Sequence, residues 1–129
     1  AKGLWYLFYE RDDRGIWLAT STDLKTWTNV QDEPVIAMGP STYDAHAVAM
    51  NQVIFYKGMY YGFYHASAFV DWHEWSTNVA VSADLIHWKK YEQNPILGLN
   101  QSSGIVLKKG RGFRLYTMHR NVRVYESRP

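Results

Sequence analysis

The chain has 129 residues, of which 47% are hydrophobic and 16% aromatic, and its net charge is +2. This length suits about one domain, and the apolar content is enough to build a core. The nearly balanced charge argues against nucleic acid as a partner. The sequence has no cysteine, which excludes disulfides and thiolate metal sites and leaves the compartment open. No apolar run approaches the roughly 18 residues of a membrane span, so we expect no membrane partner.

Alternation with a period of two, rather than a helical period, runs through the chain and predicts strands. The turns between them are rich in Gly, Ser and Asp, whose backbones or side chains favour turns. In chain order, the expected strands are 5–9, 15–20, 27–30, 45–56, 60–66, 78–82, 88–91, 103–107, 113–117 and 122–125.

These strands belong to an internal repeat. The segment Ser21–Trp27 returns as Ser82–Trp88, an offset of 61 residues, and Gly3–Tyr9 returns as Gly58–Tyr64, an offset of 55. A weaker third copy runs over Phe113–Thr117. Periods of this size, with several short strands in each, indicate propeller blades. We therefore predict an all-β fold of four-stranded antiparallel blades, with blade-like units at about 1–36, 43–97 and 101–129.

The predicted units are incomplete. The first lacks its inner strand and the third lacks its outer strand, so the chain holds about two and a half to three blades. A propeller ring has roughly four to eight blades, and this single domain of 1–129 does not close one. We expect the chain to form a homo-oligomer or to be part of a longer propeller.

Polar residues gather at one predicted rim of the blades. The entry into an inner strand and the loop between the second and third strands lie at the same rim. Four of the five histidines fall in these segments, and only His87 falls at the other rim. The site therefore belongs at the polar rim. Its candidates are Glu10, Asp44, His46, His65, Trp72, His73, Glu74, Trp75, Ser103, His119 and Arg120.

Three of these candidates have a functional and a structural interpretation. Asp44 precedes an apolar inner strand, and its carboxylate either faces the central channel as a catalytic group or caps backbone amides. His46 shares that face and either binds a ligand or ion or is a hydrogen-bonded core histidine. Glu10 is either a rim acid or the partner of Arg11 or Arg14. The neighbouring segment 12–15 is expected to be only a hairpin turn.

A long loop from Ala66 to Thr77 carries two tryptophans, Trp72 and Trp75, around His73 and Glu74. Exposed tryptophans stack on flat partners such as a pyranose ring, or they pack within their own loop. Both interpretations stay open. His65 and His73 lack a third ligand and no His-Glu-x-x-His motif occurs, so we expect no protein metal site.

The segment Tyr43–Val48 and the two Ser-x-Asp-Leu-x-x-Trp copies resemble the five-bladed β-propeller glycosidases of glycoside hydrolase families 32, 43, 62, 68 and 130. Leu4–Tyr9 and Met59–Tyr64 resemble the aromatic second strand of that group, and Thr77–Ser82 resembles its third strand. The resemblance covers nearly the whole chain, as the later part of such a propeller.

This resemblance implies glycoside hydrolysis by a carboxylic acid and a second carboxylate that acts as base or nucleophile. By position, Asp44 matches an inner-strand carboxylate, and His46 matches a channel histidine that helps some members hold an ion. Glu10 or Glu74 would supply the acid. The inner strand that bears the base aspartate of the family has no counterpart here, which leaves the carboxylate set partial.

We accordingly expect a glycoside hydrolase-like propeller that acts on a carbohydrate through carboxylates lining a central pocket. The alternative is a noncatalytic, lectin-like propeller. No cofactor is expected, apart from a calcium ion that the resemblance allows in the channel. The predicted catalytic residues are Asp44, Glu10 and Glu74. The predicted substrate-binding residues are His46, His65, Trp72, His73, Trp75, Ser103, His119 and Arg120.

Overall fold

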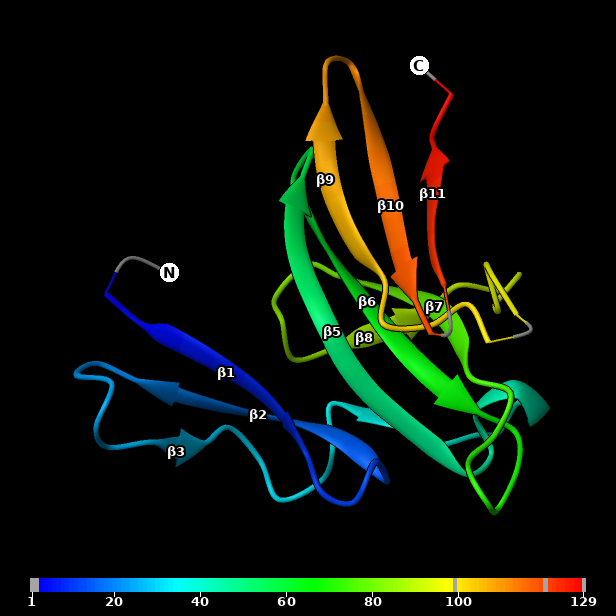
Figure 1. Ribbon diagram of the computed structural model, residues 1–129. Coiled ribbons are helices and arrows are strands. Elements are labelled where there is room, and N and C mark those ends of the chain that lie inside the picture. Colours follow the sequence, from blue (N-terminus) through cyan, green and yellow to red (C-terminus); the bar gives the residue numbers. More distant parts are fainter. Residues whose placement is uncertain (1–2, 99, 120, 129) are drawn as a thin grey trace.

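The computed structural model describes residues 3–98, 100–119 and 121–128. Its strands form three antiparallel sheets, which follow the three predicted units in chain order (Figure 1). The strands are β1 (Trp5–Glu10), β2 (Gly15–Ser21), β3 (Thr28–Asn29), β4 (Ile36–Ala37), β5 (Ala47–Tyr56), β6 (Met59–Ser67), β7 (Ser76–Ser82), β8 (Trp88–Lys90), β9 (Ile105–Lys109), β10 (Gly112–Met118) and β11 (Val122–Glu126). Among the described residues, the one helical element is the short 3-10 turn η1 (Thr42–Asp44), and no helix is long and apolar enough to cross a membrane.

The first sheet has the order β1-β2-β3, with β4 also pairing with β2. The second sheet has the order β5-β6-β7-β8, and the third has β9-β10-β11. Within the described part of the chain these sheets do not close into a ring, which confirms the all-β fold with an incomplete set of blades. Strand β4 was not predicted; it forms where the Val35 amide donates to the Ile16 carbonyl at 2.8 Å.

The repeated Ser-x-Asp-Leu segments fold as identical turns. In the second copy, the Ser82 hydroxyl accepts from the Leu85 amide at 2.9 Å, and Asp84 Oδ1 accepts from the amides of Ile86 and His87 at 2.9 and 2.8 Å. The bond from the His87 ring is the main cause that lowers the pKa of Asp84, and the amides of His87 and Ile86 add to it. The leucine takes a left-handed backbone in both copies, with φ of 62° at Leu24 and 72° at Leu85. The side-chain bonds thus specify the turn.

The core lies between the first and second sheets. Its buried members come from both sheets and from the turn before β8, and they are Ile16, Leu18, Val35, Ile36, Val48, Tyr64, Ala66, Ala80 and Leu85. The ring of Trp88 packs into this interface and meets Phe8 edge-on, with centroids 5.8 Å apart. Trp88 Nε1 donates to the Leu85 carbonyl at 2.7 Å, which fixes the ring. The repeated tryptophan of the second unit is therefore a packing residue.

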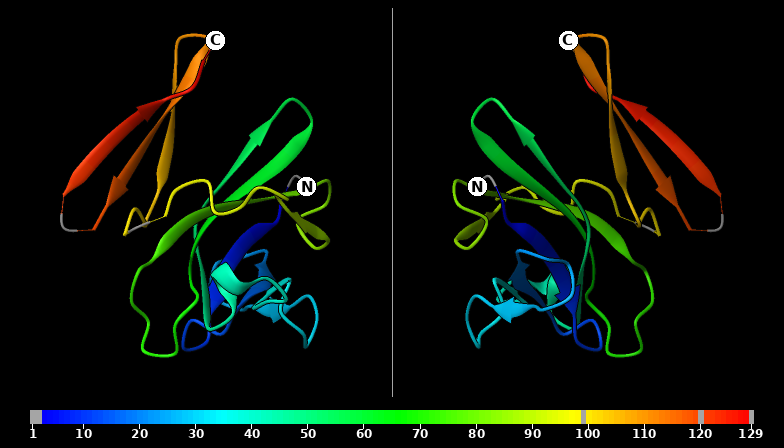
Figure 2. Two further views of the ribbon diagram at one scale, coloured as in Figure 1. Left: turned by 90° about the vertical axis from the view of Figure 1, so that its right-hand side faces the viewer. Right: turned by 90° about the vertical axis from the view of Figure 1, so that its left-hand side faces the viewer.

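The third sheet is joined to the second through one side chain in particular. The Gln52 amide donates to the Val106 carbonyl at 3.0 Å and accepts from the Val106 amide at 2.7 Å, as a neighbouring strand would. The rings of Tyr56 and Phe113 also meet, with centroids 5.0 Å apart, and Figure 2 shows the third sheet beside the β5–β6 hairpin. The first two sheets therefore form one packed body, to which the third is attached at fewer points.

Gly62 on β6 is expected to tolerate no larger residue. A Cβ at Gly62 would lie 2.9 Å from Trp88 Cζ3 and 3.0 Å from Met50 Cε. Overpacking of this kind costs roughly 1–3 kcal/mol, so Gly62→Ala should lower the free energy of unfolding by that amount in urea denaturation. Gly98→Ala is the matched control, because a Cβ at Gly98 meets no atom within 4 Å. Equal stability of the two variants would contradict this packing.

Candidate functional site

The turn between β1 and β2 lies against the start of β5 at the polar rim. Asp12 and Asp13 have positive φ angles of 49° and 52°, which aspartate tolerates better than most residues. Glu10 Oε2 accepts from the Asp13 amide at 2.9 Å, which holds the turn from within. The Asp13 carbonyl accepts from the Val48 amide at 2.6 Å, which ties the turn to β5. This local geometry presents the Asp13 side chain to the neighbouring sheet.

His65, near the end of β6, is the group that Asp13 approaches. Its Nε2 lies 4.0 Å from Asp13 Oδ1, and the two side chains are 21% and 26% exposed. Its Nδ1 lies 3.0 Å from Asn51 Nδ2 and 3.3 Å from Asn51 Oδ1. When Nδ1 accepts from the Asn51 amide group, the proton of the neutral ring sits on Nε2 and faces the Asp13 carboxylate. As a donor, Asn51 thus matches the tautomer that suits Asp13.

Burial sets the electrostatics of this pair. Loss of solvent lowers the pKa of His65 below its usual 6.5, against the opposing effect of Asp13 and Glu10. Loss of solvent also raises the pKa of Asp13 above its usual 3.8, and the nearby charges of Glu10 and Asp12 raise it further, while His65 opposes them. A carboxyl group whose pKa is raised, beside an imidazole whose pKa is lowered, is typical of proton-transfer sites.

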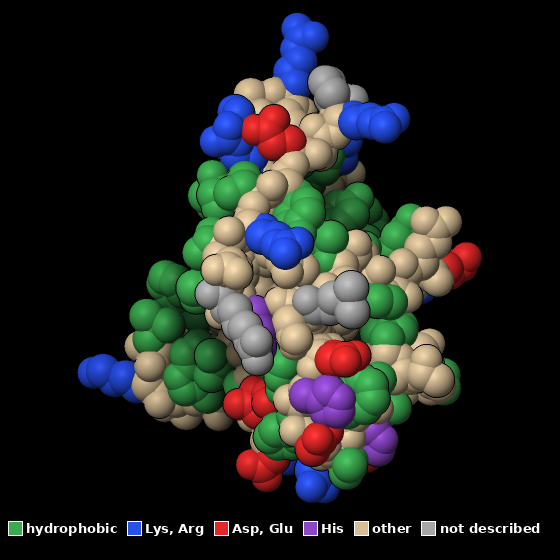
Figure 3. Space-filling model, turned by 45° about the vertical axis from the view of Figure 1, so that its right-hand side comes forward, with side chains coloured by type: hydrophobic (Ala, Val, Ile, Leu, Met, Phe, Trp, Pro, Cys, Tyr) green, Lys and Arg blue, Asp and Glu red, His purple; other side chains and the backbone are tan. Residues whose placement is uncertain are grey.

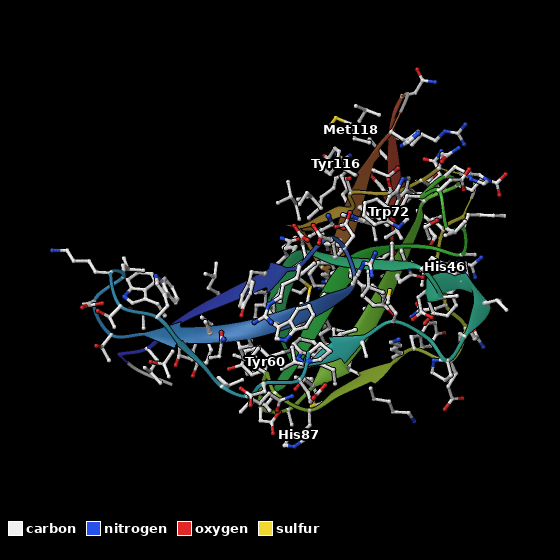
Figure 4. The ribbon with its side chains drawn as sticks, turned by 90° about the horizontal axis from the view of Figure 1, so that it is seen from below. His46, Tyr60, Trp72, His87, Tyr116 and Met118 are labelled. Carbon is white, nitrogen blue, oxygen red and sulfur yellow. The ribbon has the colours of Figure 1, made fainter. Side chains whose placement is uncertain are left out.

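Two tryptophans of the long loop border His65. Trp75 meets the His65 ring edge-on at 4.9 Å, and Trp72 lies 6.4 Å from Trp75 between ring centroids. Trp72 Nε1 donates to the His46 carbonyl at 3.2 Å, and Figure 4 shows the two residues side by side, away from His87. The Trp75 amide donates to Asn100 Oδ1 at 3.1 Å. The loop is therefore held on two sides, and Trp72 remains 37% exposed.

Asp44 lies just before β5, as the sequence predicts, and its side chain has a partner that the sequence did not indicate. Its side chain is fully buried, and its Oδ2 accepts from Lys90 Nζ at 2.5 Å. The same ammonium donates to the carbonyls of Ala37 and Gly39, both at 2.6 Å. The other oxygen, Oδ1, is buried and has no hydrogen-bond partner among the described residues. The carboxylate thus faces Lys90 rather than an open channel, and a catalytic role for Asp44 stays a prediction.

The remaining candidates differ in their burial and in their partners. His73 pairs with Asp71 at 2.5 Å and stacks on Phe69 at 4.0 Å between centroids, on the exposed part of the long loop. The side chains of His46, Glu74 and His119 are exposed, and that of Ser103 is half-buried. Arg120 lies outside the described residues. Acidic and histidine side chains gather on the lower part of the face shown in Figure 3.

Two residues of the cluster were missed by sequence reasoning. Asp13 was interpreted as part of a hairpin turn, and Asn51 was interpreted only as a strand residue. The strand register is interrupted between Met50 and Gln52, which makes Asn51 the extra residue of a β-bulge. Two adjacent polar residues, Asn51 and Gln52, within an otherwise apolar inner strand were the one signal that pointed to it. In the described part of the chain, no three His, Asp or Glu side chains are grouped to hold a metal ion.

No protein-family model and no curated protein matches this sequence. Solved structures do match. One, described as a glycoside hydrolase, has a TM-score of 0.65 and 17% identity over 98% of this chain and 40% of its own. Another, the native Bacillus subtilis arabinanase Arb43A, has a TM-score of 0.59 and 17% identity over 90% of this chain and 44% of its own. The chain thus has a fold seen in glycoside hydrolases and spans less than half the length of these two structures.

Removing only one partner of the Asp44–Lys90 pair is expected to lower the free energy of unfolding. Lys90→Met leaves a buried carboxylate without its cation, a change that destabilises proteins by roughly 3–5 kcal/mol. Lys90→Met combined with Asp44→Asn should recover much of this loss in urea denaturation. Lys89→Met is the matched control, since Lys89 forms only an exposed pair with Glu92 and should change stability little. Additive losses in the double variant would contradict the pairing.

His65 is expected to make stability depend on pH as the pH falls past 6.5, the usual pKa of histidine. Because the pKa of His65 is lowered in the folded state, the unfolded chain binds the proton more readily below the usual value of 6.5. The free energy of unfolding should therefore fall as the pH falls through this range. His65→Gln should weaken this dependence, whereas His46→Gln, at an exposed histidine of the same rim, should keep it. An unchanged slope in His65→Gln would refute the assignment.

Proposed function

We propose that this chain forms part of a glycoside hydrolase-like propeller that acts on a carbohydrate through carboxylates at the rim between its first and second sheets. The observation that carries this proposal is the Asp13–His65 pair, with its 4.0 Å separation and its opposite pKa shifts. The fold shared with a glycoside hydrolase and an arabinanase supports the same class of reaction.

Glycoside hydrolysis needs one carboxylic acid that is protonated at the working pH and one carboxylate that is not. Asp13 suits the first role, because burial raises its pKa. In this proposal Asp13 protonates the leaving oxygen. The charge state of His65, whose Nε2 faces Asp13, adjusts the pKa of the Asp13 carboxyl group. The second carboxylate comes from the predicted set of Glu10, Asp44 and Glu74, of which Glu10 lies beside Asp13. The rest of the propeller supplies any further carboxylate.

The tryptophans supply a surface for the sugar. Trp72 is partly exposed, and Trp75 adjoins the His65 ring. Apolar faces of pyranose rings stack on such side chains. A loop held by the His46 carbonyl and by Asn100 loses little conformational entropy when a ligand binds. The other proposed substrate-binding residues are His46, His65, His73, Ser103, His119 and Arg120.

A noncatalytic carbohydrate-binding module is the second candidate. The observation that favours it is the anchored Trp72–Trp75 loop, which suits binding whether or not a reaction follows. In that case Asp13 would accept a hydrogen bond from a sugar hydroxyl and would transfer no proton. The two candidates share the site and differ only in turnover.

The test uses the protein in its native assembly, whose mass is first measured by light scattering. Asp13→Asn should reduce hydrolysis of aryl glycosides and oligosaccharides by at least about 100-fold, the usual effect of losing a general acid. Asp12→Asn is the matched control, because Asp12 has the same left-handed backbone but an exposed side chain. It should keep most of the activity.

Glycan binding measured alongside separates the candidates. Binding without hydrolysis in the unmodified protein would favour the lectin-like module. An Asp13→Asn variant with full hydrolytic activity would remove Asp13 from the mechanism. Absence of both hydrolysis and binding would overturn the proposal.

A further inference from the structure

We propose that the basic end of the molecule binds an acidic polysaccharide, through ion pairs between its cations and the carboxylates of the sugar residues. This end is formed by the tips of the β5–β6 and β9–β10 hairpins, which lie on the same side of the molecule (Figure 1). The choice of a carbohydrate rests on the proposed function, whereas the positive charge of the surface does not. The cations that define the basic end are Lys57, Lys108, Lys109, Arg111 and Arg114.

Charge is divided unevenly along the chain. Residues 101–129 contain seven Lys and Arg residues and one acidic residue, Glu126. Residues 1–100 also contain seven Lys and Arg residues, but eleven acidic ones. In Figure 3, Lys and Arg side chains gather at the upper end of the face, far from the acidic and histidine side chains of the lower part. The third sheet is therefore strongly positive, although the whole chain is nearly neutral.

Only part of this positive charge is compensated within the molecule. Lys109 Nζ and Arg114 Nε both donate to Glu126 Oε1, at 2.8 and 2.7 Å, so this group of three keeps one positive charge. The side chains of Lys108 and Arg111 are exposed, and neither forms an ion pair within the described part of the chain. Cations gathered on one surface without acidic partners attract an anionic partner from solution.

Aromatic rings hold the two hairpin tips together. Tyr56, at the end of β5, meets Phe113 of β10 edge-on, with centroids 5.0 Å apart. Lys57 Nζ lies 5.3 Å from the centroid of the Tyr56 ring. On the third sheet, Lys108 pairs with Phe113 in the β9–β10 register. Cations of two different sheets are thus brought to one surface by the rings beside them.

A two-residue turn fixes Arg111 at the tip of the third sheet. Lys109 pairs with Gly112, which leaves Gly110 and Arg111 as the loop, and Gly110 has a positive φ of 57°. A glycine at the first position is typical of the tight turns that match the twist of a hairpin. The backbone of Arg111 is therefore already ordered before a ligand binds, which lowers the entropic cost of binding.

A hollow of about 610 Å³ adjoins this turn. Its lining includes Arg111, the two glycines beside it, and the half-buried ring of Phe113. The planar guanidinium of an arginine bonds both oxygens of a carboxylate, which suits recognition of such a group. An aromatic ring next to it covers the apolar face of a sugar. Together these features fit a sugar residue that carries a carboxylate.

The composition of the tips favours a polysaccharide over a membrane surface. Stable attachment to a membrane needs inserted apolar groups in addition to basic ones. The tips carry Lys57 and Gly58 on one hairpin and Gly110 and Arg111 on the other, with no apolar side chain to insert. A nucleic acid offers the same negative charge as an acidic polysaccharide, and the experiment below separates the two.

The basic end and the Asp13–His65 pair lie at opposite ends of β6. Lys57 lies in the turn that precedes this strand, and His65 lies near its end. The strand from Met59 to His65 spans roughly 20 Å. A polysaccharide held at the basic end is therefore bound apart from the Asp13–His65 pair, and the two sites are open to separate tests.

Binding of polygalacturonate, in which each sugar residue carries a carboxylate, tests the proposal. The affinity is measured by isothermal titration calorimetry on the protein in its native assembly. The double variant Lys108→Gln, Arg111→Gln should bind about tenfold more weakly or worse, because two charge-assisted contacts are lost. The matched control is Lys25→Gln, Lys89→Gln, which removes two exposed cations from the first and second sheets and should bind like the unmodified protein. The methyl ester of the polymer, which has no free carboxylates, should not bind.

Four results would overturn the proposal. The first is no measurable binding of polygalacturonate. The second is equal affinity of the two double variants, and the third is equal binding of the methyl ester. The fourth is tighter binding, at the same salt concentration, to DNA or to vesicles of phosphatidylcholine and phosphatidylserine, which would identify a nucleic acid or a membrane as the partner.

The Asp13→Asn variant separates this site from the proposed function. It should bind polygalacturonate as tightly as the unmodified protein, because Asp13 lies at the other end of β6. Loss of binding in the Lys108, Arg111 variant, in a protein that hydrolyses no glycan, would support the polysaccharide site and overturn the proposed hydrolysis. Hydrolysis in a protein whose two double variants bind equally would support the proposed function and overturn the polysaccharide site.

Discussion

Each sheet of this molecule has two apolar faces, and the need to cover both is the constraint on which the rest of the structure depends. The second sheet meets this need, because Tyr64 faces the first sheet while Tyr61 and Phe63 face the third. Burial of apolar surface contributes roughly 25 cal/mol per Å². The second sheet gains this free energy on both of its faces when it stands between the first and the third sheet. The first sheet has a neighbour on one side only, and Trp5 remains 55% exposed on the other. The rim loops take their positions from this stacking.

The β-bulge at Asn51 connects the stacking to the polar rim. One extra residue in β5 changes the directions of two consecutive amide side chains. Asn51 bonds the ring of His65, whereas Gln52 bonds both backbone groups of Val106 on the third sheet. In a regular strand, two successive residues would point to opposite faces of the sheet, so Asn51 and Gln52 would not have these directions without the bulge. A single irregularity thus both orients an imidazole and attaches a sheet.

The sequence alone predicted the strands other than β4, the repeated turns and the incomplete set of blades, because these depend on local alternation and on side chains that bond nearby amides. It also predicts a polar rim, since blade topology places loops of one kind on one side. It did not predict the ion pair of Asp44, whose partner Lys90 is 46 residues away along the chain. It did not identify Asp13 either, because an aspartate in a hairpin turn has the same local pattern whether or not a histidine from another sheet lies beside it.

The contacts of Lys90 have a consequence for the cooperativity of the molecule. This side chain lies on β8, the last strand of the second sheet, yet it bonds the carbonyls of Ala37 and Gly39 in the connection that leaves the first sheet. Local separation of β8 from β7 would therefore also release this connection. The outermost strand of one sheet is thus coupled to the chain that leaves its neighbour, and the two open together rather than one at a time.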